Sequence, residues 1–173
     1  KFLLNYIILT MKKLFLFVFM GMMSLTIIAQ NKPASPEMTA ENDLFKVVYG
    51  APSKKGREIF GGLVPFNAIW RTGANKATEI TFKKDVTVGG KAVKAGTYAL
   101  FTIPTAKEWT IILNSELGQW GSYGYDKVKE KNVAEVKVTS TMVDAVQELF
   151  TIKAHASGFD ILWDKTKVSV HVK

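Results

Sequence analysis

The 173-residue chain has no cysteine, only two histidines and only five prolines. Without cysteine it can form neither a disulfide nor a thiolate metal site, and a cysteine nucleophile is excluded as well. Hydrophobic residues make up 47% of the chain and charged residues 22%, which excludes disorder throughout and collagen-like repeats. At this length we expect a single domain with one sizeable core.

A cleavable export signal is predicted near the N-terminus. Lys12 and Lys13 precede an apolar run over residues 14–28, and Ala29 supplies a small residue before the polar Gln30. This order of basic region, apolar core and small residue is typical of a secretory signal peptide. A membrane anchor is the rival interpretation, but the run is shorter than the roughly 20 residues that a spanning helix needs.

The signal divides the chain into segments. Residues 1–10 are interpreted as read-through upstream of the true start, and residues 11–29 as the signal peptide, cleaved after Ala29. Residues 30–41 contain two prolines and no apolar periodicity, which predicts a flexible leader. We expect one domain over residues 42–173, located in the periplasm or secreted, with no stable membrane insertion after cleavage.

The positive charge is modest once the signal is set apart. The full chain carries 23 Lys+Arg and 15 Asp+Glu, a formal charge of +8. Three of the lysines and none of the acids belong to the first 29 residues, which leaves a mature charge of +5. A charge of this size, spread along the chain, favours solubility. An exported protein is not expected to meet nucleic acid.

Alternating apolar and polar residues predict strands. Thr78, Ile80 and Phe82 share one face of a short segment, while the residues between them share the other. The same period of two recurs over residues 150–154, 159–163 and 168–172, each typical of a half-buried strand. Only Val143–Leu149 competes as a helical turn.

Turn signals fall between these predicted strands. They are Gly89-Gly90, Ala95-Gly96, Pro104-Thr105-Ala106 and Asp164-Lys165. Strands joined by short hairpins, without long helical patterns, predict an all-β fold. We expect an antiparallel β-sandwich, jelly-roll-like or partly barrel-like.

Common catalytic and metal-binding patterns are missing. His155 and His171 lie in different strand regions without a third ligand at close spacing, so neither a metal site nor a cofactor is expected. The chain has no G-x-S-x-G elbow and no Gly-Lys-Ser/Thr phosphate loop. Asp160 and Asp164 share one face of a strand, as a glycosidase pair would, but solvated strand residues are the favoured interpretation.

The unusual feature is aromatic residues beside cations and amides. One group occupies residues 70–75, and the other is a glycine-rich loop over residues 117–126. Loops on a rigid sandwich often carry function, and rings among glycines offer flat surfaces for sugars or peptides. For Trp70 and Trp120 themselves, however, burial in the core is the favoured interpretation. The candidate ligand-binding residues are Arg57, Trp70, Arg71, Asn75, Trp120 and Tyr123.

Several strings together carry a family resemblance. They are Pro-x-Lys-Lys-Gly-Arg at residues 52–57, Phe-Gly-Gly-Leu-Val-Pro-Phe at 60–66, Trp-Arg-Thr-Gly-Ala-Asn at 70–75, Ala-Gly-Thr-Tyr at 95–98 and Glu-Trp-Thr-Ile-Ile-Leu-Asn at 108–114. These strings resemble the bacterial domain-of-unknown-function family 2911 over nearly the whole mature domain. The resemblance implies an exported, mostly β protein with no assigned activity and no accepted catalytic residues.

The chain departs from the family pattern at a few positions. Gly50-Ala51 stands where the family commonly has Ser-Arg, Asn67 stands where it commonly has Gly, and Lys76 replaces a usual Glu. If that Arg and Glu belong to a site, this member has lost two polar contributors. Arg57, Arg71 and Asn75 match the pattern.

Three functions remain open. The first is a non-catalytic binding module in which Arg71 and Asn75 hold a small polar or carbohydrate ligand against tryptophan rings. The second is a structural or assembly domain of the cell envelope, in which Arg71 pairs internally with a carboxylate such as Glu79. The third is a carboxylate-based hydrolase. Convergence of Arg71, Asn75 and Trp120 on one exposed concavity would favour the first.

Overall fold

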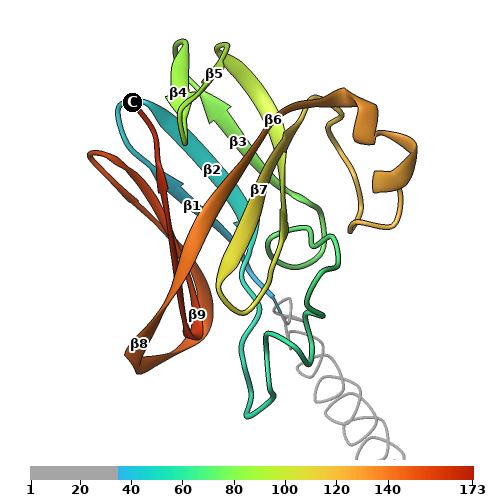
Figure 1. Ribbon diagram of the computed structural model, residues 1–173, viewed down its shortest axis with the longest axis vertical. Helices are drawn as coiled ribbons and strands as arrows, with labels where there is room; N and C mark the ends of the chain where they lie inside the picture. Colours follow the sequence, from blue (N-terminus) through green and yellow to red (C-terminus); the bar gives the residue numbers. More distant parts are fainter. Residues whose placement is uncertain (1–34) are drawn as a thin grey trace, which may run out of the picture. The chain divides into compact units, whose positions relative to one another are not determined.

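The computed structural model describes residues 35–173, and the predicted signal peptide and read-through segment lie outside the described residues (Figure 1). Its strands are β1 (Glu37–Glu41), β2 (Phe45–Gly50), β3 (Thr78–Phe82), β4 (Val86–Val88), β5 (Lys91–Val93), β6 (Gly96–Ile103), β7 (Glu108–Asn114), β8 (Asn132–His155) and β9 (Gly158–His171). The described part of the chain contains two 3-10 turns, η2 (Tyr125–Lys127) and η3 (Lys129–Lys131), and no α-helix. The all-β prediction is confirmed.

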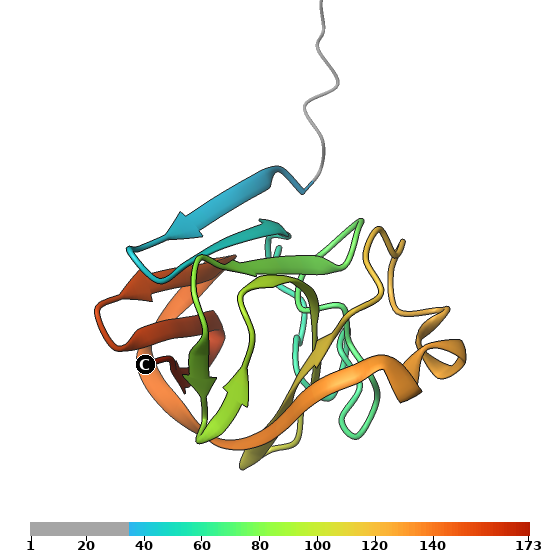
Figure 2. The same ribbon diagram turned by 90° about the horizontal axis from the view of Figure 1, so that it is seen from above.

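Seven strands form one antiparallel sheet in the order β1-β2-β3-β6-β7-β8-β9, and β4 pairs with β5 in a small second sheet. The large sheet curls until β8 contacts β1 (Figure 2). Inside the curl, Phe45 and Tyr49 of β2 pack against Phe159 of β9 and Phe150 of β8. Backbone bonds then bridge its two halves: Lys54 N–H donates to the Glu148 carbonyl, and Phe150 N–H donates to the Pro52 carbonyl. The fold is therefore antiparallel and partly barrel-like.

Strand β9 reverses direction at Asp164. In a straight strand, Asp160 and Ser169 would lie roughly 30 Å apart, because each residue advances about 3.3 Å. The Ser169 hydroxyl instead donates a 2.6 Å hydrogen bond to the Asp160 carboxylate. Asp164 has the positive φ of 53° that such a reversal needs. The turn predicted at Asp164-Lys165 thus lies within β9.

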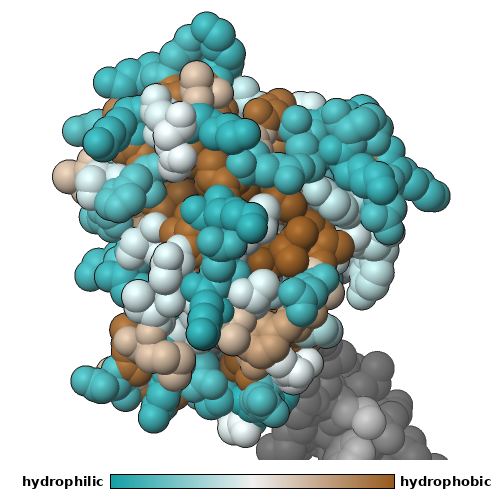
Figure 3. Space-filling model, in the orientation of Figure 1, coloured by the Kyte–Doolittle hydropathy of each residue, from teal (hydrophilic) through white to brown (hydrophobic). Residues whose placement is uncertain are grey.

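The predicted alternation places the hydrophobic residues in the core. Thr78, Ile80 and Phe82 are at most 2% exposed, and the apolar faces of β8 and β9 are buried in the same way. Central strands β6 and β7 are buried on both faces. Leu100 belongs to the main core inside the curl, whereas Phe101 and Ile112 pack on the outer face beneath Tyr125. Hydrophilic residues cover most of the surface in Figure 3.

The flexible leader predicted over residues 30–41 is wrong for Glu37–Glu41, which form strand β1. The five residues pair with β2 in register from Glu37 opposite Gly50 to Glu41 opposite Lys46. Four of the five side chains are exposed, so backbone hydrogen bonds and not apolar burial hold this edge strand. Such a strand leaves no apolar periodicity in the sequence.

Val143–Leu149 does not form the competing helical turn. It lies within β8, where the pairing with β9 shifts register between Met142 and Thr151. Over residues 35–173, no helix has the length and apolar character needed to cross a membrane.

Candidate functional site

A cavity of about 580 Å³ lies beside the long connection between β2 and β3. Its volume falls in the range of small-molecule sites, roughly 300–1,000 Å³. The sequence-predicted residues that line it are Arg57, Trp70, Arg71, Asn75 and Tyr123. The fold therefore brings five of the six candidates together, from the β2–β3 connection and the loop between β7 and η2.

Positive charge dominates the lining of this cavity. Lys55, Arg57 and Arg71 line it, and among residues 35–173 no Asp or Glu does so. The chain has only two arginines against 21 lysines, and both arginines lie here. The uncharged polar groups of the lining are Ser35, Ser53, Asn75 and Ser122.

Trp70 forms part of the core and of the cavity wall at the same time. Its backbone exchanges hydrogen bonds of 2.8 and 2.9 Å with Thr102, which fixes the loop to β6. Its ring is 8% exposed and stacks on Trp163, with centroids 6.0 Å apart and planes inclined by 15°. The favoured interpretation of Trp70 as a core residue is therefore confirmed, and the alternative of an open stacking face is wrong.

Thr72, on the other side of Arg71, is a second buried anchor. Its hydroxyl lies 3.2 Å from the Thr102 hydroxyl, and its carbonyl accepts a 2.6 Å hydrogen bond from Thr78. Thr72 has φ 54°, in the left-handed region that β-branched residues rarely adopt, whereas Asn75 has φ 65°, which asparagine tolerates. Strained backbone of this kind gathers at functional sites, where the surrounding structure holds it.

Arg71 is partly exposed between these anchors, and its guanidinium has no acceptor among the described residues. Its Nε is buried without a hydrogen-bond partner. The predicted pairing with Glu79 is wrong: the Glu79 carboxylate accepts a 3.0 Å bond from Gly118 N–H, and no ion pair joins it to Arg71. A Cβ added at Gly121 would touch both the Arg71 Nη1 and the Tyr123 ring, so these two side chains lie side by side.

Arg57 and Asn75 are held by neighbouring backbone. The exposed Arg57 guanidinium donates to the carbonyls of Ser53 and Lys54, which fixes it on its own turn. Asn75 Nδ2 donates a 3.2 Å bond to the Ser35 carbonyl. Both side chains are thus oriented before any ligand arrives, which lowers the entropy that binding would cost.

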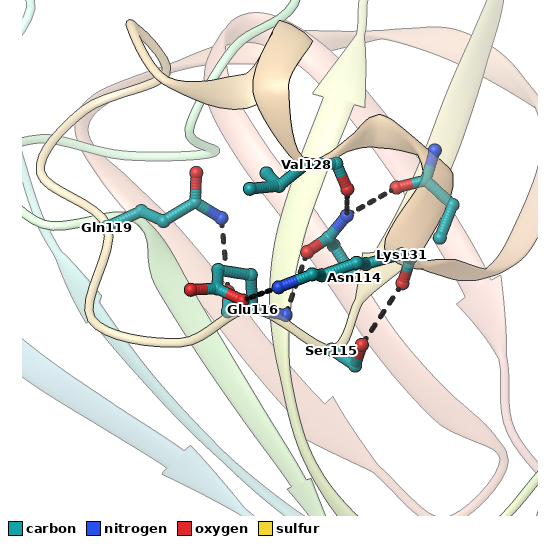
Figure 4. A network of polar contacts seen from close by, with 7 residues as sticks. Asn114, Ser115, Glu116, Gln119, Val128 and Lys131 are labelled. Atoms are coloured by element: carbon teal, nitrogen blue, oxygen red, sulfur yellow. Dashed lines mark hydrogen bonds and ion pairs between the residues drawn. The ribbon is translucent and has the colours of Figure 1, made fainter.

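The loop between β7 and η2, which carries Trp120 and Tyr123, is anchored by the buried Asn114 (Figure 4). The Asn114 amide donates 2.7 Å bonds to the Val128 carbonyl and to Asn132, and its oxygen accepts from Glu116 N–H at 2.8 Å. One buried side chain therefore ties the start of the loop to its end.

Trp120 lies outside the main cavity. It is 64% exposed and lines a neighbouring hollow of about 300 Å³, which shares Ala74 and Asn75 with the main cavity. Arg71 and Asn75 thus converge on one concavity, as the binding hypothesis expected, whereas Trp120 lines the adjoining one. Burial of Trp120 in the core, the favoured interpretation from the sequence, is wrong.

The other titratable candidates lie elsewhere. Asp160 pairs with Lys167 at 3.0 Å, and Asp164 pairs with Lys54 at 2.8 Å. Neither carboxylate lines the main cavity. Within the described chain, no cluster of three or more His, Cys, Asp or Glu side chains is arranged to hold a metal ion.

A family model described as "Protein of unknown function (DUF2911)" matches residues 32–172. The chain belongs to the DUF2911 family. No curated protein and no solved structure matches it.

The four positions expected to depart from the family pattern lie in different places. Gly50 and Lys76 line the hollow beside Trp120, Ala51 is fully buried, and Asn67 lies in the connection between β2 and β3 with φ 59°. Arg57, Arg71 and Asn75, which were expected to match the pattern, line the main cavity.

Sequence reasoning missed several lining residues. Lys55, Ser53 and Ser122 line the cavity beside the predicted residues. Lys55 lies in the same Pro-x-Lys-Lys-Gly-Arg string as Arg57 but was not among the predicted residues, and the serines carry no sequence signal. Only the curl of the sheet brings these turns together.

Proposed function

We propose that this DUF2911 protein is an exported, non-catalytic binding module that holds a small polar ligand, such as a sugar, in the cavity beside Arg71. The observation that carries the proposal is the convergence of Arg57, Arg71, Asn75 and Tyr123 on one cavity of about 580 Å³. A cavity of this size with a few oriented polar groups is the usual form of a small-molecule site.

The cavity walls supply hydrogen-bonding groups and an aromatic ring for a small polar ligand. Arg71, Asn75 and Ser122 offer hydrogen-bonding groups, and Tyr123 adds an aromatic ring that is 85% exposed. Trp70 and Trp163 form a rigid floor because they belong to the aromatic core. Oriented groups on a rigid floor favour binding, since little side-chain freedom is lost.

The cavity offers poor means for hydrolysis by a carboxylate pair, because no Asp or Glu of the described chain lines it. We therefore place binding ahead of the hydrolase. We also propose that the protein acts in the periplasm or outside the cell, where a chain without cysteine is insensitive to the redox conditions.

The proposal is tested on residues 30–173 by thermal-shift screening against neutral sugars, sugar acids, amino acids and short peptides, followed by calorimetry. We expect at least one class to raise the melting temperature, and Asn75→Ala or Tyr123→Ala to weaken its binding. Met142→Ala is the control for Tyr123→Ala, because Met142 is 75% exposed on β8, outside this cavity. Equal weakening by the control, or no binding by any class, would contradict the proposal.

A docking role in the cell envelope is the second candidate, and one observation favours it. Leu117, Trp120 and Tyr123 are 44%, 64% and 85% exposed on a single anchored loop. Exposed aromatic side chains close together are common at protein interfaces. In that case Trp120→Ala would reduce crosslinking to an envelope component in cells while leaving small-ligand binding unchanged.

A further inference from the structure

We infer that the ligand of the main cavity carries an oxyanion, a carboxylate or a phosphate, which the guanidinium of Arg71 binds. This inference rests on the proposed function, which requires only that some small polar ligand occupies the cavity. The charge of the lining is the first argument. Lys55, Arg57 and Arg71 face the same space with no Asp or Glu of residues 35–173 among them. A neutral sugar would not need this concentration of positive charge.

The cavity also gathers the arginines of the chain. The chain uses lysine for 21 of its 23 basic positions, and most of them lie on the outer surface. Both arginines line the cavity. A guanidinium differs from an ammonium in its planar fork, which matches the two oxygens of a carboxylate or phosphate with parallel hydrogen bonds.

Arg71 has hydrogen-bond donors that no acceptor of the described chain satisfies. Its Nε is buried without a partner, and its guanidinium donates to no acceptor in the described chain. Arg57, by comparison, already donates to two backbone carbonyls. A buried donor without a partner is costly, and a bound oxyanion would compensate the charge that Arg71 brings to the cavity.

Nearby carboxylates are directed to other partners. Glu79 accepts from Gly118 N–H, Glu148 accepts a 2.8 Å bond from Lys55 N–H, and Asp164 pairs with Lys54. None of the three lines the cavity. The protein therefore keeps its own acids away from Arg71, as expected of a site that receives an acid from outside.

The size of the cavity defines the rest of the ligand. An oxyanion alone fills only a fraction of about 580 Å³. The remaining walls combine the polar Asn75 and Ser122 with the aromatic Tyr123 ring. This combination fits a small organic acid or sugar acid, in which hydroxyl groups accompany the anionic group.

The test uses three probes that share one ring: glucose, glucuronate and glucose 6-phosphate. They differ only at C6, which is a hydroxymethyl group, a carboxylate or a phosphorylated hydroxymethyl group, so the two sources of oxyanion are separate arms of the experiment. The readout is the arginine Nε–Hε region of a ¹H–¹⁵N NMR spectrum of residues 30–173. The chain has two arginines and hence two signals, and Arg71→Lys identifies the Arg71 signal by its loss.

We expect glucuronate or glucose 6-phosphate, but not glucose, to shift the Arg71 signal in a saturable way. Arg71→Met, which keeps the length of the side chain without its charge, should weaken binding of that probe at least about tenfold, as for a charge-assisted hydrogen bond. Lys91→Met removes one charge on the exposed strand β5, outside the cavity, and should leave the dissociation constant unchanged. If Arg71→Met fails to fold, Arg71→Lys replaces it, because it keeps the charge and loses only the planar fork.

The outcomes separate the two proposals. Saturable binding of glucose that equals binding of the acids, unaffected by Arg71→Met, would overturn the oxyanion inference and leave the proposed function standing. Binding of an acid that Arg71→Met and Lys91→Met weaken equally would overturn it too, because only general charge would then be involved. Absence of any shift of cavity residues with all three probes at millimolar concentrations would count against the oxyanion inference, while the wider screen decides the proposed function.

Discussion

At the scale of single residues, a few buried or confined positions set the geometry of the candidate site. Gly50 is one of them: the Ala74 carbonyl would lie 2.1 Å from a Cβ added there. The loop of residues 70–75 can approach β2 this closely only because Gly50 has no side chain. Both Arg71 and Asn75 depend on this approach for their position.

Gly50→Ala should therefore displace the loop and lower the free energy of unfolding by about 1–3 kcal/mol, the usual cost of overpacking. Urea titration measures this loss. Gly124→Ala is the matched control, because Gly124 has φ −92° and its Cβ would meet nothing closer than 3.9 Å. A Gly50→Ala variant as stable as Gly124→Ala would show that the loop is not confined by this contact.

Asn114 is the second such residue. Replacing it with alanine leaves the partly buried Val128 carbonyl and Glu116 N–H without their side-chain partner, so we expect a loss of about 1–3 kcal/mol in total. Ser115→Ala removes only an exposed hydroxyl bonded at 3.3 Å and should change stability by less than about 0.5 kcal/mol. Chemical denaturation of both variants checks this. Equal effects would contradict the anchoring role of Asn114.

At the scale of elements, strand β1 is held differently from the rest of the sheet. A chain that begins at Asn42 lacks β1 and exposes the edge of β2, whereas a chain that begins at Ser35 retains it. We expect the shorter chain to melt several degrees lower, because about 1 kcal/mol corresponds to roughly 4 °C in a domain of this size. Differential scanning calorimetry of the two chains gives the answer. Equal melting temperatures would mean that β1 contributes no stability.

The elements that the sequence predicts well are those whose burial alternates. Segments such as Thr78–Phe82 and Val168–Val172 show a period of two because one face packs in the core. Strand β1 shows none, since its side chains stay exposed. The turn at Asp164 was predictable from local residues, whereas the pairing across the curl depends on contacts far apart in sequence.

In the candidate site, too, the sequence predicts the residues with a local signal and misses those that depend on contacts far apart in sequence. Arg71 and Asn75 stand out in the sequence because they sit beside an aromatic residue in one loop. Lys55 and Ser122 reach the cavity only through the packing of other loops. Trp70 lies in the core and Trp120 on the surface. This difference follows from the surrounding fold, because the residue type is the same.

At the scale of the whole molecule, acid stability depends on how β9 folds back. Partial burial alone would raise the pKa of Asp160. Hydrogen bonds from Ser169 and Lys167, together with the charges of Lys167 and His155, outweigh this effect of burial. The pKa of Asp160 therefore lies below its ordinary value. A carboxylate with a lowered pKa stabilises the fold above the pKa of the unfolded chain. That contribution disappears as pH falls through the lower, folded-state pKa.

Asp160→Asn should consequently lower the melting temperature near pH 6, and the difference from the unmodified protein should shrink between about pH 4 and pH 2. Asp85→Asn is the control: the hydrogen bonds from Lys94 and Ala95 lower the pKa of Asp85 as well, but this pair is fully exposed and screened by water. The melting temperature of Asp85→Asn should differ little from that of the unmodified protein at every pH. Melting curves of the three proteins across this range decide the matter. A gap for Asp160→Asn that stays constant down to pH 2 would mean that Asp160 acts through packing alone, because only an ionised carboxylate loses its contribution in acid.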